Sequence, residues 1–150
     1  MKMIRIVHPE TGTGPYMSQG KVRNPNDDYD VFSLYKLSHN SMHSPEPSRD
    51  ELLVKNYLAT HLQQIRLDVS SYLFGFTGLD QAFKWFGSSN ILKMMHWYAF
   101  ELQVRDVPDH CAVEGDSQMM AYEAAWNEAP ILKKLTVDEV EDYARKLRRK

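Results

Sequence analysis

Three segments of the chain carry the residue pattern that begins an α-helix. In each, a serine or threonine is followed three residues later by an acidic residue, so that hydroxyl and carboxylate can satisfy the free amides of the first turn. The pairs are Ser48 with Glu51, Thr77 with Asp80, and Thr136 with Glu139. Apolar residues at helical spacing follow, which predicts helices over about 48–66, over 79–86 and from Thr136 towards the C-terminus.

Strand-like runs lie between these helices. Residues 3–7, 69–76 and 98–107 are rich in β-branched, aromatic and other apolar side chains, and residues 111–115 and 117–124 predict the two arms of a hairpin around Gly115 and Asp116. The segment 90–97 predicts a further helix, and 31–37 either a short strand or one helical turn. The mixture predicts one α+β domain over residues 1–150, with a small, twisted, mainly antiparallel sheet and several helices.

Composition narrows the class of protein. The chain has 150 residues, the size of one domain, and a single cysteine, which excludes an internal disulfide framework and fits a reducing compartment. No apolar run is long enough to span a bilayer, so we expect a cytoplasmic protein without a membrane partner. A net charge of -2 argues against a dedicated nucleic-acid binder. The exception is residues 144–150, "ARKLRRK", a basic helix end or tail.

The residues alone offer few catalytic candidates. The loop "ETGTGPY" has neither the lysine of a phosphate-binding loop nor the third glycine of a dinucleotide fingerprint, which favours a surface turn. Gly12 and Gly14 still permit close backbone approach to a ligand. His39 and His43 lie four residues apart but lack a third ligand of fixed spacing, so no metal is expected. Cys111 has only His110 beside it. Neighbouring residues of a strand point to opposite faces, so this pair is a poor catalytic dyad.

Two resemblances add to this interpretation. The segments "RIVHPETGTGPY", "HSPEPSRD" and "FGFTGLDQAFKWF" resemble a set of short phage-encoded proteins over most of the chain up to about Met120. The order of the motifs is also similar to that of the small ADP-ribosyltransferase fold. That fold carries an Arg or His on its first strand, a Ser or Tyr on a second strand, and a Glu or Gln on a late strand.

The second resemblance implies a site for NAD. Arg5 and His8 would anchor the cofactor beside the loop of Gly12 and Gly14, and Ser70 or Ser71 would support the site. Tyr72 would stack on or orient the nicotinamide ring, and Gln118 or Glu123 would face the reacting ribose. A carboxylate there would stabilise the positive charge that builds up on the ribose as the bond breaks. Gln118 departs from the pattern, since a neutral amide stabilises that charge less.

These observations lead to two functional hypotheses. The first is a phage accessory protein that binds NAD and transfers ADP-ribose to a host macromolecule. The alternative is a noncatalytic protein that inhibits a host defence or regulatory protein by binding it, which the missing carboxylate at Gln118 favours. Nucleic-acid binding through residues 144–150 ranks below both. The sequence leaves the target and the oligomeric state open.

Overall fold

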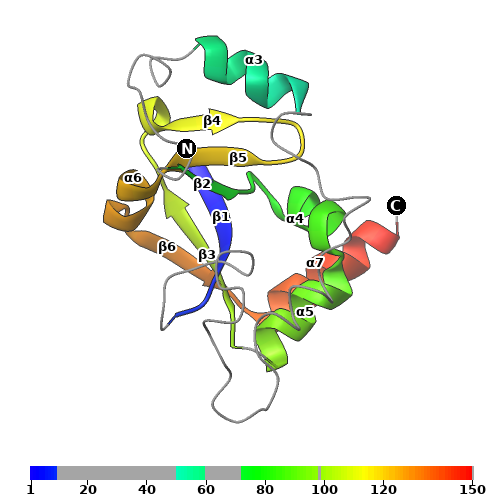
Figure 1. The fold of residues 1–150 in the computed structure, drawn as a ribbon. Helices are drawn as coiled ribbons and strands as arrows, with labels where there is room; N and C mark the ends of the chain where they lie inside the picture. The colour runs from blue at the N-terminus through cyan, green and yellow to red at the C-terminus, as the bar shows by residue number, and fades with distance from the viewer. Residues whose placement is uncertain (10–49, 60–71, 98, 150) are drawn as a thin grey trace.

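The computed structural model describes residues 1–9, 50–59, 72–97 and 99–149 (Figure 1). Within these ranges the elements follow in the order β1 (Lys2–Val7), α3 (Glu51–Ala59), β2 (Tyr72–Gly75), α4 (Leu79–Phe86), α5 (Ser88–Trp97), β3 (Glu101–Asp106), a 3-10 turn η4 (Asp109–Cys111), β4 (Ala112–Glu114), β5 (Met119–Tyr122), α6 (Glu123–Glu128), β6 (Ile131–Leu135) and α7 (Val137–Arg148). The fold is α+β, as the sequence predicted. The segment 31–37 and the loop of Gly12 and Gly14 lie outside the described residues.

Two three-stranded antiparallel sheets form the centre of the fold. One has the strand order β1-β3-β6 and the other β2-β5-β4. They meet where the backbones of Ile4 and Phe76 form an antiparallel bridge, with N–O distances of 2.7 and 2.9 Å in the two directions. The sheet expected from the sequence is therefore two small sheets joined through the backbones of β1 and the end of β2.

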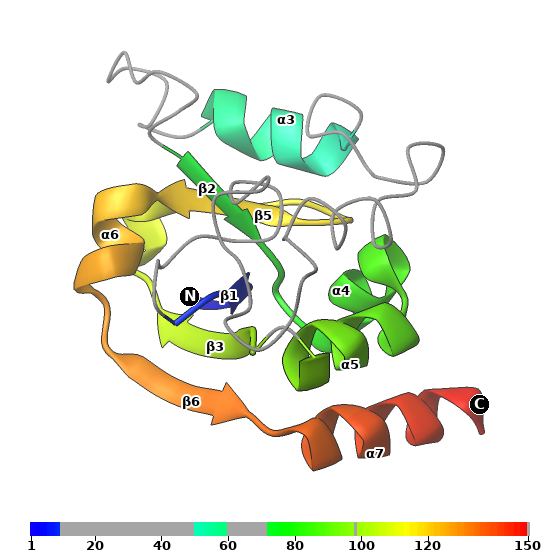
Figure 2. The ribbon, with the colours of Figure 1, turned by 60° about the horizontal axis from the view of Figure 1, so that its bottom comes forward.

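Both faces of β1 are buried, because the two sheets and their helices stack in layers. Ile4 and Ile6 pack against side chains of α4, α5 and α7. Met3 and Val7 point the other way, into a layer that also holds Met119 of β5. Beyond the second sheet, a third cluster contains side chains of α3. Figure 2 shows α3 and the group α4, α5 and α7 on different sides of the strands.

Two of the three predicted capping pairs lie within the described residues, and one of the two forms as predicted. Thr136 and Glu139 form the predicted capping box at α7. Helix α4 begins after Gly78 without a side-chain cap, and the amide of Thr77 donates to the carboxamide of Gln81 at 2.8 Å. Asp80 instead accepts a hydrogen bond from the hydroxyl of Tyr143 in α7. A tertiary contact has thus recruited the carboxylate that the local pattern assigned to the cap.

Helix α3 begins at Glu51, and Asp50 caps its first turn by accepting a hydrogen bond from the amide of Leu53 at 3.0 Å. The sequence pattern placed this start at Ser48, which lies outside the described residues. The described part of the helix ends at Ala59, so its predicted extension to about Arg66 stays untested.

The hairpin of β4 and β5 is confirmed, with Val113 opposite Met120. Its second arm is shorter than predicted, because the chain turns into α6 at Glu123 instead of continuing as a strand to Ala124. Glutamate and alanine favour helices, and Pro130 follows the end of this one. The sequence interpretation missed both α6 and β6. None of the described helices is long and apolar enough to cross a bilayer.

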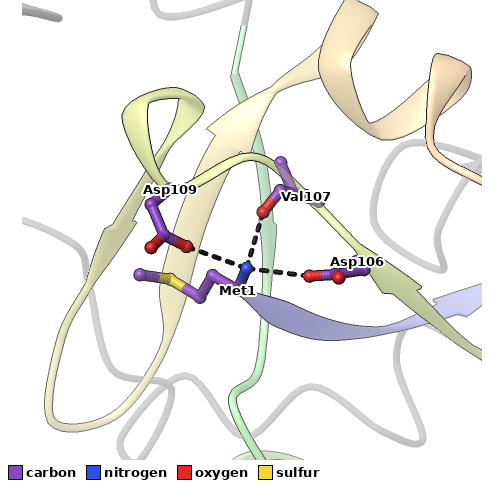
Figure 3. Close-up of polar contacts among 4 residues, drawn as sticks. All are labelled: Met1, Asp106, Val107 and Asp109. Carbon is purple, nitrogen blue, oxygen red and sulfur yellow. Dashed lines mark hydrogen bonds and ion pairs between the residues drawn. The ribbon is translucent and has the colours of Figure 1, made fainter.

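The amino group of Met1 is held where β1 meets the end of β3 (Figure 3). It donates to the carboxylates of Asp106 and Asp109 at 2.8 and 2.9 Å and to the carbonyl of Val107 at 2.7 Å. The two carboxylates raise the pKa of this amine above its ordinary value, mainly through hydrogen bonds, Asp106 first and Asp109 second. The charged amine therefore ties the start of β1 to the segment that follows β3.

Acetylating the amino group of Met1 is expected to lower the midpoint of thermal unfolding by about 1 to 3 °C, because both carboxylates are exposed and water screens them. A raised folded-state pKa stabilises the fold below the unfolded pKa of about 8, and this contribution is lost as the pH rises through the folded value. The acetylated and free chains should therefore differ at pH 6 and converge at high pH. A constant difference across that range would contradict this.

Candidate functional site

The residues predicted to form an NAD site fall into two groups. Arg5, His8, Tyr72, Gln118 and Glu123 belong to the described part of the chain. The other predicted residues lie outside it, and they are Gly12, Gly14, Ser70 and Ser71. The structure therefore tests the relative placement of the first group alone.

Arg5 lies on β1 and is 6% exposed. Its Nε donates to the carbonyl of Phe74 in β2 at 3.0 Å, and its guanidinium carbon lies 5.6 Å from the centre of the Trp126 ring. Burial lowers the pKa of Arg5 to about 10, with attraction by Glu123 opposing the shift and repulsion by Arg105 adding to it. The side chain is charged at neutral pH and sits between the two sheets.

Tyr72 and Gln118 lie elsewhere. Tyr72 of β2 stacks on Tyr122 of β5, with ring centres 5.2 Å apart, and belongs to the cluster that contains Leu53 of α3. Burial, followed by the neighbouring rings of Tyr122 and Tyr57, raises the pKa of the Tyr72 hydroxyl. Gln118 is 1% exposed, in the segment that leads into β5. Trp126, which lies beside Arg5, belongs to a different cluster, on the face of the β2-β5-β4 sheet opposite to Tyr72.

His8 and Glu123 complete the group. His8 is buried directly after β1, and its ring meets Phe100 edge-on at a centre-to-centre distance of 5.3 Å. Phe100 belongs to the cluster with α4, α5 and α7. Glu123 is exposed at the start of α6 and close enough to Arg5 to affect its pKa. The structure thus brings Arg5 and Glu123 near each other, whereas a sheet separates Arg5 from Tyr72. NAD binding by the whole set stays a prediction.

A polar chain beside Arg5 was missed by the sequence interpretation. Arg105 of β3 lies over the same Trp126 ring at 4.7 Å, and its Nη1 donates to the carbonyls of Trp126 and Ala129 at 2.9 and 3.3 Å. Its Nη2 donates to Gln103 at 2.8 Å, and Gln103 in turn donates to Glu101 at 2.9 Å. The signal was present, since residues 101, 103 and 105 alternate with apolar residues and must share a face of a strand.

A second buried polar site joins α3 to the β4–β5 turn. The carboxylate of Asp50, 5% exposed, accepts hydrogen bonds from the amides of Leu53, Asp116 and Ser117 at 2.9 to 3.0 Å. It also accepts one from the hydroxyl of Ser117 at 2.8 Å. Burial alone would raise the pKa of Asp50, but these hydrogen bonds outweigh it and lower the pKa below its ordinary value. Every donor here belongs to the protein, which indicates a structural role.

No metal site emerges from the part of the chain that is described, where no three His, Cys, Asp or Glu side chains gather closely enough to hold an ion. Cys111 is partly buried, and burial, with a smaller effect of Glu128, raises the pKa of its thiol. A thiol with a raised pKa is a poor nucleophile at neutral pH. Cys111 thus lacks the lowered thiol pKa that is typical of a nucleophilic cysteine.

Comparison with known protein families identifies this α+β chain as a bacteriophage protein. The family model described as Bacteriophage T4 Y00F protein matches residues 1–133, so the chain belongs to that family. No curated protein and no solved structure matches the chain. The family agrees with the resemblance to short phage proteins and points to an accessory role, and none of the comparisons shows a similarity to ADP-ribosyltransferases.

Proposed function

We propose that this phage protein acts by binding a host protein, without catalysis, and that strand β6 is the contact surface. The observation that carries the proposal is the exposure of apolar side chains on an edge strand. Ile131 and Leu132 are 43% and 50% exposed, and the strand is exposed along nearly its whole length. Soluble proteins seldom leave such an edge uncovered, because its free amides and carbonyls can pair with another chain.

The geometry of β6 supports pairing with a partner strand. Within the described residues β6 pairs with β3 alone, so its other edge has no strand beside it. The register with β3 shifts between Val104 and Arg105, and Leu132 has no residue opposite it. The irregularity lies at the start of the strand, where the two apolar residues Ile131 and Leu132 follow one another. A partner in extended conformation could gain backbone hydrogen bonds along the edge and apolar contacts at these two positions.

Lysines on an edge strand usually discourage pairing through their charge. On β6 that effect is reduced, because Lys133 forms an ion pair with Glu139 of α7 and Lys134 forms one with Glu101 of β3 at 3.2 Å. Both ammonium groups are thus partly neutralised by the protein itself. A host protein could therefore approach the edge without meeting two unpaired positive charges.

Affinity capture from host cells tests the proposal. The unchanged chain is expected to recover one host protein in equal molar amount. Leu132→Lys should weaken its capture at least about tenfold, because a charge replaces an apolar contact on the proposed surface. Val54→Lys is the matched control, since Val54 is a 38% exposed apolar residue on α3, away from β6. Equal capture by the unchanged chain and Leu132→Lys would contradict β6 as the surface.

NAD-dependent transfer is the competing hypothesis, and the closeness of Glu123 to Arg5 is what favours it. A carboxylate and a buried cation near each other could serve ribose and phosphate groups, respectively. An assay with labelled NAD on host lysate separates the two functions. Incorporation of label that Glu123→Gln abolishes, and that Glu128→Gln on the same helix retains, would replace the binding hypothesis with the transferase hypothesis.

A further inference from the structure

Arg5 is buried, and one of the two terminal nitrogens of its guanidinium, Nη1, has no hydrogen-bond partner in the described structure. Arginine carries five N–H groups. In the described structure one of them, on Nε, donates to the carbonyl of Phe74 at 3.0 Å, and Nη1 is buried without a hydrogen-bond partner. A buried donor without a partner is costly and is seldom left so in a native protein. Nη1 is therefore available to donate a hydrogen bond to a group that the described part of the chain does not supply.

The second relevant feature of Arg5 is the set of charges around its guanidinium. Among the described residues no carboxylate forms an ion pair with it, and the attraction of Glu123 acts from an exposed position. Arg105 adds a second positive charge nearby, and its own donors are already used by Gln103 and by carbonyls at the end of α6. An isolated buried cation is strongly unfavourable. The balance of charge around Arg5 thus favours an anion.

The ring of Trp126 does not remove this need. A cation interacts with an aromatic face when it lies within about 6 Å of the ring centre, and the attraction weakens with distance. Arg105 lies at 4.7 Å and Arg5 at 5.6 Å, near the outer limit. The face of the ring has no lone pair comparable to that of a carbonyl oxygen. The ring is therefore a weak replacement for a charged hydrogen-bond acceptor.

We propose that Arg5, supported by the positive charge of Arg105, binds one oxyanion group, a phosphate or carboxylate carried by a small molecule. The free Nη1 would donate to an anion oxygen in a strong charge-assisted hydrogen bond. This inference is independent of β6, and it requires neither nicotinamide nor transfer chemistry.

Tryptophan fluorescence gives a local test in the full chain. The protein has three tryptophans, and Trp85→Phe with Trp97→Phe leaves Trp126 beside Arg5 as the single reporter. Inorganic phosphate and acetate, each titrated against chloride at constant ionic strength, should change the emission with saturation in roughly the millimolar range. The stronger of the two responses identifies the group as phosphate or carboxylate. A response no larger than that to chloride, with both anions, would overturn the proposal.

A variant pair assigns the response to Arg5. Arg5→Met in the same background should weaken the binding of the anion at least about tenfold. Arg145→Met is the matched control, because Arg145 is exposed on α7 and lies 4.0 Å from Asp142. Undiminished binding by Arg5→Met would overturn the proposal. If Arg5→Met does not fold, calorimetric titration of the unchanged chain with both anions decides, since the absence of saturable heat would equally overturn it.

Discussion

Gly75→Ala is expected to destabilise the protein by about 3 kcal/mol, because it inserts a methyl group between the two sheets. A Cβ at this position would lie 2.6 Å from the carbonyl oxygen of Ile4 and 2.9 Å from the side chain of Arg5. The Ile4 backbone cannot easily retreat, since it exchanges two hydrogen bonds with Phe76. Relieving the overlap would therefore break the bridge that joins the sheets.

Urea denaturation of the variant and the unchanged chain measures this loss, as a lower midpoint at an unchanged slope. Gly78→Ala, three residues further on, is the matched control. A Cβ at Gly78 would meet no atom within 4 Å. That substitution should therefore lower the free energy of unfolding by no more than about 1 kcal/mol, which is the usual cost of alanine at a helix start. Similar losses in both variants would show that the close approach of β1 and β2 does not control stability.

Asp50→Ala is expected to cost about 3 kcal/mol, because it removes the common acceptor of three backbone amides and one hydroxyl. The amides of Leu53 and Ser117 would lose their charged partner inside the protein. The site is also sterically tight, since a Cβ on Gly115 would lie 2.7 Å from the side chain of Leu53. Little rearrangement can therefore bring water to the freed amides.

The pH dependence of stability distinguishes the charge of Asp50 from its size. Its folded-state pKa is lowered, so its contribution is full above the unfolded value of about 3.9 and is lost as the pH falls through the folded value. The difference between the unchanged chain and Asp50→Asn should therefore be large at pH 6 and shrink in acid. Asp116→Asn, at an exposed carboxylate in the same turn, is the matched control for substitution within the turn. A difference that stays constant down to pH 2 would contradict this.

Local pattern predicted much of the secondary structure and failed where distant partners intervened. The capping box of Thr136 and Glu139 formed as predicted, because both members lie within one helical turn. Asp80 has the same spacing from Thr77 but binds Tyr143 from a helix far along the chain. Strand β6 was missed because the exposed sequence "ILKKL" lacks the alternation that marks a half-buried strand.

For the candidate site residues too, the sequence could not predict which distant segments lie beside them. The sequence singled out Arg5, but its burial depends on the layer between the two sheets and on Trp126, more than a hundred residues away. Tyr72 and Gln118 were grouped with Arg5 from the order of motifs along the chain. Strand pairing instead placed a sheet between Arg5 and Tyr72, and motif order carries no information about which face a side chain occupies.

The sequence by itself therefore determined the α+β class, most strands and helices, and the phage resemblance, because these depend on residues close together along the chain. Only the tertiary structure decided that Asp50 closes the hairpin turn. Within the described residues, it also decided that Arg5 lies buried without an ion-pair partner and that Ile131 and Leu132 lie on a strand edge that no other strand covers. Each of these depends on which distant segments meet, and the pairing of strands, not their local composition, settles that.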